Sequence, residues 1–261
     1  MKIIKFLAAF LCAAILSSCL DTEEKITFNG DESGTYSMTI DLSRMLKMAG
    51  TLGSDTSAGA KIKEKKDTTV YLKDLVSTAD NLTAAEKELY KDGMIHVNLD
   101  EMQNEMKIVM SSPFKNAAGL TEIKNNFSTV MNKLKAFEKA TGEKEKAEEE
   151  NEDLKMGAKS VNPVGDQFTF KAGDGKVSNT INNVDAFKKL VTTDSSLTMM
   201  SQMSGMGGDF NYRTIIVLPK AVKKYNGPGS TISTDKRTIT FFTTLAEMME
   251  HPEKVSYTVE Y

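Results

Sequence analysis

The sequence contains repeated pairs of short segments in which apolar and polar residues alternate, and this pattern most constrains the fold. Ile26 and Phe28 alternate with polar residues before the turn-forming sequence NGDESG. Tyr36, Met38 and Ile40 alternate in the same way after it. A period of two places one set of side chains on one face of a strand, and Gly, Asn and Asp between two such runs predict a hairpin turn. This segment is therefore expected to form a β-hairpin.

The same pattern recurs further along the chain. Residues 94–114 contain two alternating runs, and residues 166–181 contain two more around the turn sequence AGDG. The C-terminal part adds the strand-like sequences YRTIIVLP and RTITFFTTL, and alternation over residues 255–259 closes the chain. These segments predict a second and a third hairpin and several C-terminal strands.

Helical segments are predicted between the strand pairs. Thr83 and Glu86 form a capping-box pattern, as do Thr244 and Glu247, and each pattern marks the start of a helix. From about residue 121 apolar residues recur three or four positions apart, which predicts one helix face. This stripe consists of Phe127, Val130, Met131, Leu134 and Phe137. The charged sequence EKEKAEEENEDLK that follows has no apolar face and predicts either a solvated helix extension or a disordered link.

Strand pairs with interspersed helices predict an α+β fold, in which a mainly antiparallel sheet built from hairpins is packed with several helices. The chain of 261 residues is long enough for one large domain. We predict a single α+β domain over residues 25–261, with a helical, charged insertion around 121–158.

The N-terminus has the pattern of an export leader. Lys2 and Lys5 precede the apolar run Phe6–Leu16, which is shorter than the about 20 residues of a spanning helix. A basic start, a short apolar core and small residues before a break are typical of a secretory signal peptide. Residues 1–18 are therefore predicted to be a leader that is cut after Ser18.

The sequence LSSC at residues 16–19 resembles the lipobox of bacterial lipoproteins. The resemblance implies that Cys19 carries a diacylglycerol on its thiol and that its amino group, freed by cleavage, carries a fatty acid such as palmitate. More than one acyl chain is needed for stable anchoring. The alternative is an ordinary signal peptide with an incidental cysteine. Cys12 lies in the leader, so the mature chain would have no cysteine pair for a disulfide.

Acidic residues follow the cysteine at once, at Asp21, Glu23 and Glu24. We expect residues 19–24 to be an acylated, acidic tether that holds the domain away from the lipid. Leu20 stands where the inner-membrane retention signal of enteric lipoproteins has aspartate, and acid-rich runs at this place resemble surface-export tags. These resemblances imply an outer-membrane lipoprotein that faces either the periplasm or the cell surface.

Charge and composition argue against several classes of function. The chain has 33 basic and 36 acidic residues, well mixed, without the basic stripe of a nucleic-acid binder. Its two histidines, His96 and His251, have no ligand partner at helical spacing. No phosphate-loop, metalloprotease or serine-nucleophile motif occurs in the sequence. We therefore predict no catalytic residue, no metal site and no cofactor, and that the protein is not an enzyme. An enzyme stays open as a third alternative, since two carboxylates from distant positions could meet in the folded chain.

A methionine-rich segment, LTMMSQMSGMGGDF at residues 197–210, is the other unusual feature. Met199, Met203 and Met206 would share one face of a helix, with Met200 beside them. Methionine forms adaptable apolar surfaces, and its thioether is also a soft ligand for copper(I). Three interpretations stay open: a mobile lid or contact surface at a ligand site, ordinary core packing, or a metal site. We favour the first.

The C-terminal sequence TIIVLPKAVKKYNGPGSTISTDKRTITF resembles the LppM-type lipoprotein domain. In that family a strand ending near Pro219 leads through a turn like Asn226-Gly227 to a strand like 238–241, and the opening sequence GTYSMTIDLS fits the same pattern. The resemblance covers roughly a third of the chain. Phe241 stands near the family's usual tryptophan, and the long middle helix is a further departure. The resemblance implies a lipid-anchored α+β domain that holds a lipid-like ligand.

These patterns predict a non-catalytic lipoprotein of the cell envelope that binds a lipid-like or other hydrophobic ligand. The alternative is an interaction or assembly factor for another envelope protein, with an exposed apolar patch. The helix that carries Phe127 and Phe137 is one place for such a patch, although we expect it to pack on the sheet. A ligand binder needs an apolar cavity, whereas an assembly factor needs an exposed patch. The structure can therefore distinguish the two.

Overall fold

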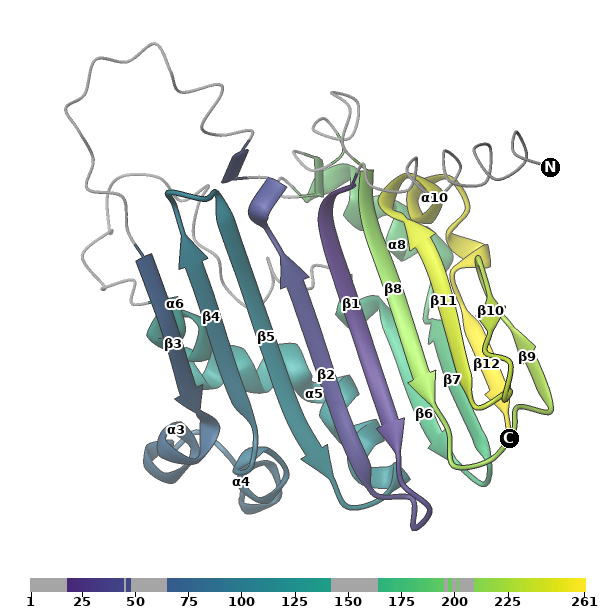
Figure 1. The fold of residues 1–261 in the computed structure, drawn as a ribbon, viewed down its shortest axis with the longest axis horizontal. Coiled ribbons are helices and arrows are strands. Elements are labelled where there is room, and N and C mark those ends of the chain that lie inside the picture. The colour runs from purple at the N-terminus through teal and green to yellow at the C-terminus, as the bar shows by residue number, and fades with distance from the viewer. Residues whose placement is uncertain are drawn as a thin grey trace, which may run out of the picture.

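The strands gather into two sheets in the computed structural model of the protein (Figure 1). It describes residues 18–44, 46–47, 65–141, 164–194, 197–198, 201 and 209–261. Sheet A has the strand order β10-β11-β8-β1-β2-β5-β4-β3, and sheet B has the order β6-β7-β12-β9. The strands of sheet A are β1 (Ser18–Phe28), β2 (Gly34–Asp41), β3 (Lys65–Tyr71), β4 (Met94–Asp100), β5 (Glu105–Phe114), β8 (Asp209–Val217), β10 (Thr231–Ile232) and β11 (Thr238–Thr244). Those of sheet B are β6 (Phe168–Gly173), β7 (Lys176–Ile181), β9 (Lys224–Asn226) and β12 (Tyr257–Glu260).

The α-helices lie between these strands in the sequence. They are α3 (Leu72–Thr78), α4 (Ala84–Tyr90), α5 (Ala117–Leu134), α6 (Ala136–Thr141), α8 (Val184–Thr193) and α10 (Leu245–Glu250). All strand pairs of the described residues are antiparallel except β1 and β8, which run parallel. The predicted α+β class with mainly antiparallel sheets is therefore confirmed. Among the described residues, no helix is both long and apolar enough to cross a membrane.

The three predicted hairpins are confirmed. In the first, Ile26 of β1 lies opposite Tyr36 of β2. The second is formed by β4 and β5, and the third by β6 and β7. The third turns through Asp174 and Gly175, both of which have positive φ angles, 52° and 70°. A two-residue hairpin turn of this kind needs positive φ at both central residues, which explains the Asp-Gly pair.

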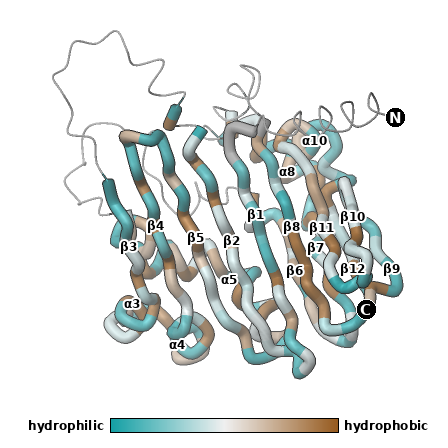
Figure 2. Tube along the Cα trace, viewed as in Figure 1, coloured by the Kyte–Doolittle hydropathy of each residue, from teal (hydrophilic) through white to brown (hydrophobic). Residues whose placement is uncertain are grey.

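Among the described residues, α5 and sheet B cover one face of sheet A, and no helix or strand covers the other. Figure 1 looks onto the uncovered face, with α5 and sheet B behind the sheet. Figure 2 shows hydrophobic and hydrophilic residues alternating along the long strands. On β2 the buried side chains Tyr36, Met38 and Ile40 alternate with more exposed ones, as expected for a strand with one face on the core.

Strand β1 corrects the predicted boundary of the domain. The sequence predicts a solvated tether over residues 19–24, but β1 begins at Ser18 and lies between β2 and β8. Asp21 pairs with Asp41 of β2 and with Asn211 of β8. The tether prediction is therefore wrong for these acidic residues, and the folded domain begins before residue 25. The cause is tertiary, because β8 becomes a neighbour of β1 only in the folded chain.

Helix α5 covers sheet A from behind. The side chain of Asn116 caps its first turn, since Asn116 Oδ1 accepts a hydrogen bond of 2.8 Å from the Gly119 amide. It ends at Lys135, whose φ of 48° is left-handed, so Phe137 belongs to α6. Its buried face contains Ala117, Leu120, Ile123, Phe127, Ser128, Val130, Met131 and Leu134.

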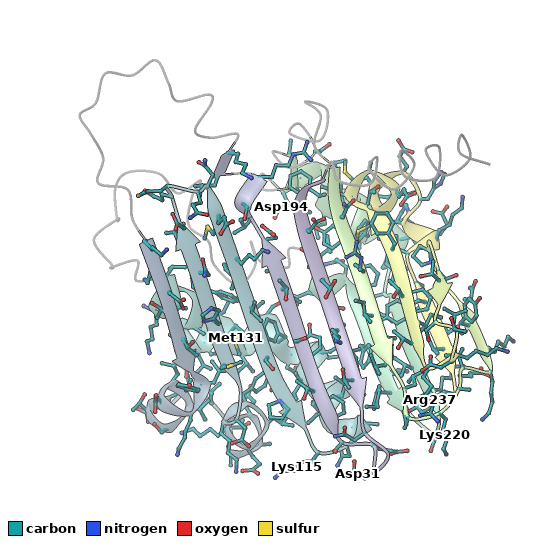
Figure 3. The ribbon with its side chains drawn as sticks, in the orientation of Figure 1. Asp31, Lys115, Met131, Asp194, Lys220 and Arg237 are labelled. Carbon is teal, nitrogen blue, oxygen red and sulfur yellow. The ribbon has the colours of Figure 1, made fainter. Side chains whose placement is uncertain are left out.

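The predicted apolar stripe is confirmed as one buried helix face for Phe127, Val130, Met131 and Leu134, whereas Phe137 is wrongly included, because it lies in the next helix, α6. Met131, labelled in Figure 3, is 1% exposed, and Phe127 and Phe137 are both buried. The expected packing of this segment on the sheet is confirmed, and it is not the place of the exposed patch that the assembly alternative needs. Within the predicted charged insertion, helices α5 and α6 bury one face in the core, while residues 142–158 lie outside the described residues.

Two side chains of α5 hold sheet B beside the helix. Asn125 Nδ2 donates to the Phe170 carbonyl at 2.9 Å, and the Phe170 amide donates to Asn125 Oδ1 at 2.9 Å. The Ala172 amide donates to Thr121 Oγ1 at 3.0 Å. These contacts satisfy backbone groups on the open edge of β6, an edge that would otherwise be free to pair with another chain.

Candidate functional site

A cavity lies where α5 and sheet B meet the covered face of sheet A. It has a volume of about 110 Å³ and is partly open to solvent. Its wall is formed by β1, β2, β8 and β11 of sheet A, by α5, and by β6, β7 and β12 of sheet B. The aromatic side chains that line it are Tyr36, Phe127, Phe168, Phe170, Phe241 and Tyr257, with Tyr212 and Phe242 beside them.

A charged cluster is enclosed among these rings. Lys124 Nζ of α5 lies 2.5 Å from Glu24 Oε2 of β1, and the two side chains are only 7% and 16% exposed. The Tyr36 hydroxyl donates to the other carboxylate oxygen, Glu24 Oε1, at 2.8 Å. Both carboxylate oxygens therefore have a donor, as a buried charge requires.

The ammonium group of Lys124 also faces two aromatic rings. Its Nζ lies 5.2 Å from the centre of the Tyr36 ring and 4.9 Å from the centre of the Phe170 ring. Both distances are within the range of cation–π attraction. Burial, followed by the nearby negative charge of Glu24 and the hydrogen bond to it, raises the pKa of Tyr36 well above its ordinary value. Tyr36 thus remains a neutral hydrogen-bond donor.

Tyr257 of β12 is the unusual member of the wall. Its ring stacks on Phe241, with the centres 4.6 Å apart and the planes 14° from parallel. The residue is 4% exposed, and its hydroxyl has no hydrogen-bond partner in the described part of the protein. Burial, and then the charge of Glu24, raise the pKa of Tyr257 well above its ordinary value. A buried donor without a partner costs about 1–3 kcal/mol, so this hydroxyl marks an incomplete site.

Two further charged residues line the cavity: Arg213, which lies 3.4 Å from Glu23, and Asp166, and both are exposed. Burial raises the pKa of Tyr212 to about 12, so that this side chain is not ionised near neutral pH. Glu24 and Lys124 compensate each other's charge. The cavity therefore combines aromatic surface with hydrogen-bonding groups that carry no net charge.

The size of the cavity limits what it holds. An engineered protein cavity of about 150 Å³ binds one benzene molecule. A space of about 110 Å³ therefore accommodates a small molecule or one end of a longer one, and a whole diacyl lipid does not fit inside it. The polar cluster and the rings would orient such a group.

A second hollow lies on the uncovered face of sheet A. Its volume is about 260 Å³, and polar side chains of β1, β2, β5 and β8 line it. These side chains contact one another: Lys107 lies 3.2 Å from Asp41, and Arg213 lies 3.4 Å from Glu23. Because both of its cations are paired and no aromatic side chain lines it, this hollow is the weaker candidate.

In the described part of the chain, none of the site residues predicted from the sequence lines this cavity. Cys19 lies in β1, next to the irregular pairing between β1 and β8. Met199, Met200, Met203 and Met206 lie outside the described residues, so the lid interpretation stays a prediction. His96 lies 3.6 Å from Asp67 and His251 lies 3.4 Å from Glu253. Among the residues that the structure describes, no group of three or more His, Cys, Asp and Glu is placed to hold a metal ion.

The sequence contains a signal for the buried pair. Glu24 occupies the same face of its strand as Ile26 and Phe28, and an alternating pattern assigns that face to the core. Lys124 likewise follows Ile123 on the apolar side of α5. Two opposite charges at core positions predict a buried ion pair. This signal is missed where Glu24 is assigned to the tether.

Comparison with known proteins adds little to this geometry. No protein-family model and no curated protein matches the chain. A search of solved structures finds the NMR structure of the folded domain of LppM from Mycobacterium tuberculosis, aligned over 94% of this chain and 91% of that one. The two are 9% identical with a TM-score of 0.35, and at these values the similarity carries no argument about function.

Proposed function

We propose that this protein is a non-catalytic lipoprotein of the bacterial cell envelope that binds a small, largely apolar ligand between its two sheets. The observation that carries the proposal is the cavity of about 110 Å³ lined by aromatic rings, with a charge-neutral polar cluster in its wall. A small number of convergent polar groups in a mainly apolar pocket is typical of binding sites for small molecules.

The leader pattern supports the location. A basic start, a short apolar run and the sequence LSSC lead to Cys19, which we propose as the acylated anchor in the outer membrane. Since β1 begins at Ser18, no tether separates the anchor from the domain. The end of sheet A where β1 begins would rest on the lipid, and the turn with Asp31, at the opposite end of the sheet in Figure 3, would point away from it.

Native mass spectrometry tests the ligand proposal. The full chain with Cys19→Ala is purified from the soluble envelope fraction and measured without denaturant. A retained mass that dissociates on activation supports binding. A mass that equals that of the bare chain, together with no shift of cavity resonances when small apolar molecules are added, rejects it.

Fractionation tests the anchor and the location. Cys19→Ala should lose incorporation of labelled palmitate and leave the membrane fraction, whereas a substitution of the adjacent Ser18 by Ala should retain both. Protease treatment of intact cells then distinguishes the cell surface from the periplasm. Labelling of the Cys19→Ala chain would contradict the anchor.

An interaction or assembly factor is the second candidate. Tyr71 of β3 and Met94 of β4 lie opposite each other in the sheet and are 59% and 36% exposed. They form an apolar spot at the edge of sheet A. Photocrosslinking from position 71 in cells tests this candidate, and capture of one partner there, together with an empty cavity, would favour it over ligand binding.

A further inference from the structure

The charged and polar groups of the cavity indicate which chemical class of ligand it binds. This inference rests on the proposed function. We infer that the cavity selects an uncharged ligand that presents a hydrogen-bond acceptor, such as an ester or ether oxygen, to the hydroxyl of Tyr257. The inference combines two observations: a buried donor that has no partner, and charged neighbours that already compensate each other.

The hydroxyl of Tyr257 is the hydrogen-bond donor available to a ligand. Among the cavity-lining residues that the structure describes, Tyr257 alone has a buried side-chain polar group without a hydrogen-bond partner. Its ring is fixed by the stack on Phe241 at 4.6 Å. A phenol that is held neutral by burial donates one hydrogen bond, so a ligand acceptor would satisfy it. A ligand without an acceptor would leave the donor unpaired and buried.

The buried charges of Glu24 and Lys124 already compensate each other. Both oxygens of Glu24 already accept, one from Lys124 and one from Tyr36. Lys124 in turn is surrounded by this carboxylate and by two aromatic rings. The other charged lining residues, Arg213 and Asp166, are exposed, and Arg213 lies 3.4 Å from Glu23. An anionic ligand at the buried pair would have to displace Glu24 or lie close to its charge, and a cationic ligand there would lie close to Lys124. Both arrangements bury an uncompensated charge, which is costly in a site of low dielectric constant.

Three small probes of equal size separate these possibilities: ethyl acetate, butyrate and benzene, each with six non-hydrogen atoms. Ethyl acetate carries a neutral acceptor, butyrate an anionic one, and benzene none. They are titrated into the full chain with Cys19→Ala, and binding is followed by two-dimensional NMR at the amides of Phe241, Tyr257 and Phe170. The expected order of affinity is ethyl acetate before benzene before butyrate.

The variant Tyr257→Phe removes the donor and keeps the ring. It should raise the Kd for ethyl acetate about 3- to 10-fold, the equivalent of one hydrogen bond, and leave benzene binding unchanged or tighter. Tyr90→Phe is the matched control, because the Tyr90 hydroxyl is buried outside this cavity and donates to the Ile123 carbonyl at 2.9 Å. It should leave all three affinities unchanged.

The outcomes separate this inference from the proposed function. If ethyl acetate binds equally to the wild-type chain and to Tyr257→Phe, the hydroxyl is not used and the inference fails, while the cavity remains a binding site. Tighter binding of butyrate than of ethyl acetate also rejects the inference, since Lys124 would then be available to anions. If no probe shifts the cavity resonances, the proposed function fails as well.

Discussion

The ammonium group of Lys124 and the carboxylate of Glu24 lie 2.5 Å apart, and they join β1, one of the two central strands of sheet A, to the helix that covers the sheet. The two residues are 100 positions apart in the sequence. Because both side chains are largely buried, the removal of either one should lower the stability of the fold more than the removal of one member of a surface ion pair. It also forms the polar wall of the cavity, so that stability and ligand recognition depend on the same contact.

Removal of one member of this pair should be strongly destabilising. Lys124→Met leaves a buried carboxylate with Tyr36 as its remaining donor, and should lower the free energy of unfolding by about 3 kcal/mol. The double variant Lys124→Met, Glu24→Gln should recover at least about 1 kcal/mol, because it no longer buries a lone charge. Urea unfolding measures both values.

Lys115→Met is the control for the same kind of substitution. Lys115 lies 2.7 Å from Glu88, but their side chains are 79% and 53% exposed. An exposed pair contributes about 0–1 kcal/mol, so this variant should unfold close to the wild type. Equal effects of the two lysine substitutions would contradict the buried role of Lys124.

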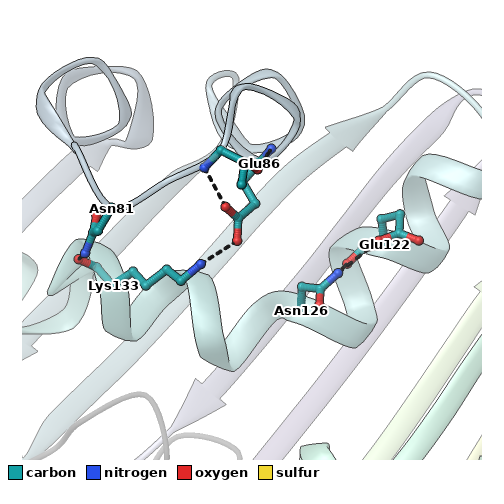
Figure 4. Close-up of polar contacts among 6 residues, drawn as sticks. Asn81, Glu86, Glu122, Asn126 and Lys133 are labelled. Carbon is teal, nitrogen blue, oxygen red and sulfur yellow. Dashed lines mark hydrogen bonds and ion pairs between the residues drawn. The ribbon is translucent and has the colours of Figure 1, made fainter.

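The hydrogen bonds between α5 and β6 give the second prediction. Asn125→Ala removes one donor and one acceptor for the Phe170 backbone and should lower the free energy of unfolding by about 2 kcal/mol. It should also speed hydrogen exchange at the Phe170 amide. The neighbouring Asn126 bonds within its own helix, to Glu122, as Figure 4 shows. Asn126→Ala should therefore change neither the free energy of unfolding nor the exchange rate of the Phe170 amide by much. A larger effect at 126 than at 125 would refute the conclusion that Asn125 holds β6 to α5.

The sequence predicts those parts of the fold that depend on local pattern. The alternation around Ile26 and Tyr36 predicts the first hairpin in the observed arrangement. The capping boxes at Thr83 and Thr244 start α4 and α10, since in each the threonine oxygen accepts from the glutamate amide three residues later. In these cases neighbours in the sequence are also neighbours in space, so the pattern determines the structure.

The candidate site could not be assembled in the same way. The parallel pairing of β1 with β8 joins residues about 190 positions apart, such as Glu23 and Arg213. Nothing in the local sequence predicts which distant strand will lie beside β1. Without that neighbour, the acidic residues at the start of the strand have the pattern of a solvated tether. Alternation places Tyr257 on a strand, but that strand's place in a second sheet and the missing hydroxyl partner are tertiary facts.

The close contact at Gly34 gives the third prediction. A Cβ atom at this position would lie 1.9 Å from the Thr27 carbonyl oxygen and 2.5 Å from the Phe114 ring. Since one of these atoms belongs to the backbone of β1, the strand has to move, and Gly34→Ala should lower the free energy of unfolding by at least about 2 kcal/mol. A Cβ atom at Gly30, in the same hairpin, would have no described atom within 4 Å, so Gly30→Ala should stay within about 0.5 kcal/mol of the wild type. Thermal unfolding of both variants tests the difference.

The junction of α4 and α5 sets up the last prediction. Figure 4 shows Glu86 between its own helix start and Lys133 of α5. Lys133 Nζ donates to Glu86 Oε1 at 2.7 Å, and the Thr83 amide donates to Glu86 Oε2 at 2.7 Å. The hydrogen bond from Lys133, and then those with Thr83, hold the pKa of Glu86 at about 2, compared with 4.5 for an ordinary glutamate.

This shift makes stability depend on pH in one direction. A carboxyl group with a lower pKa in the folded chain stabilises fully above its unfolded pKa, here about 4.5, and loses that contribution as the pH falls through about 2. The urea midpoint of the wild type should therefore fall between about pH 5 and pH 2.5, and Glu86→Gln should show a shallower fall. Glu105→Gln, at an exposed glutamate that starts β5, should keep the wild-type slope. If Glu86→Gln falls as steeply as the control, the charge of Glu86 does not hold α4 to α5.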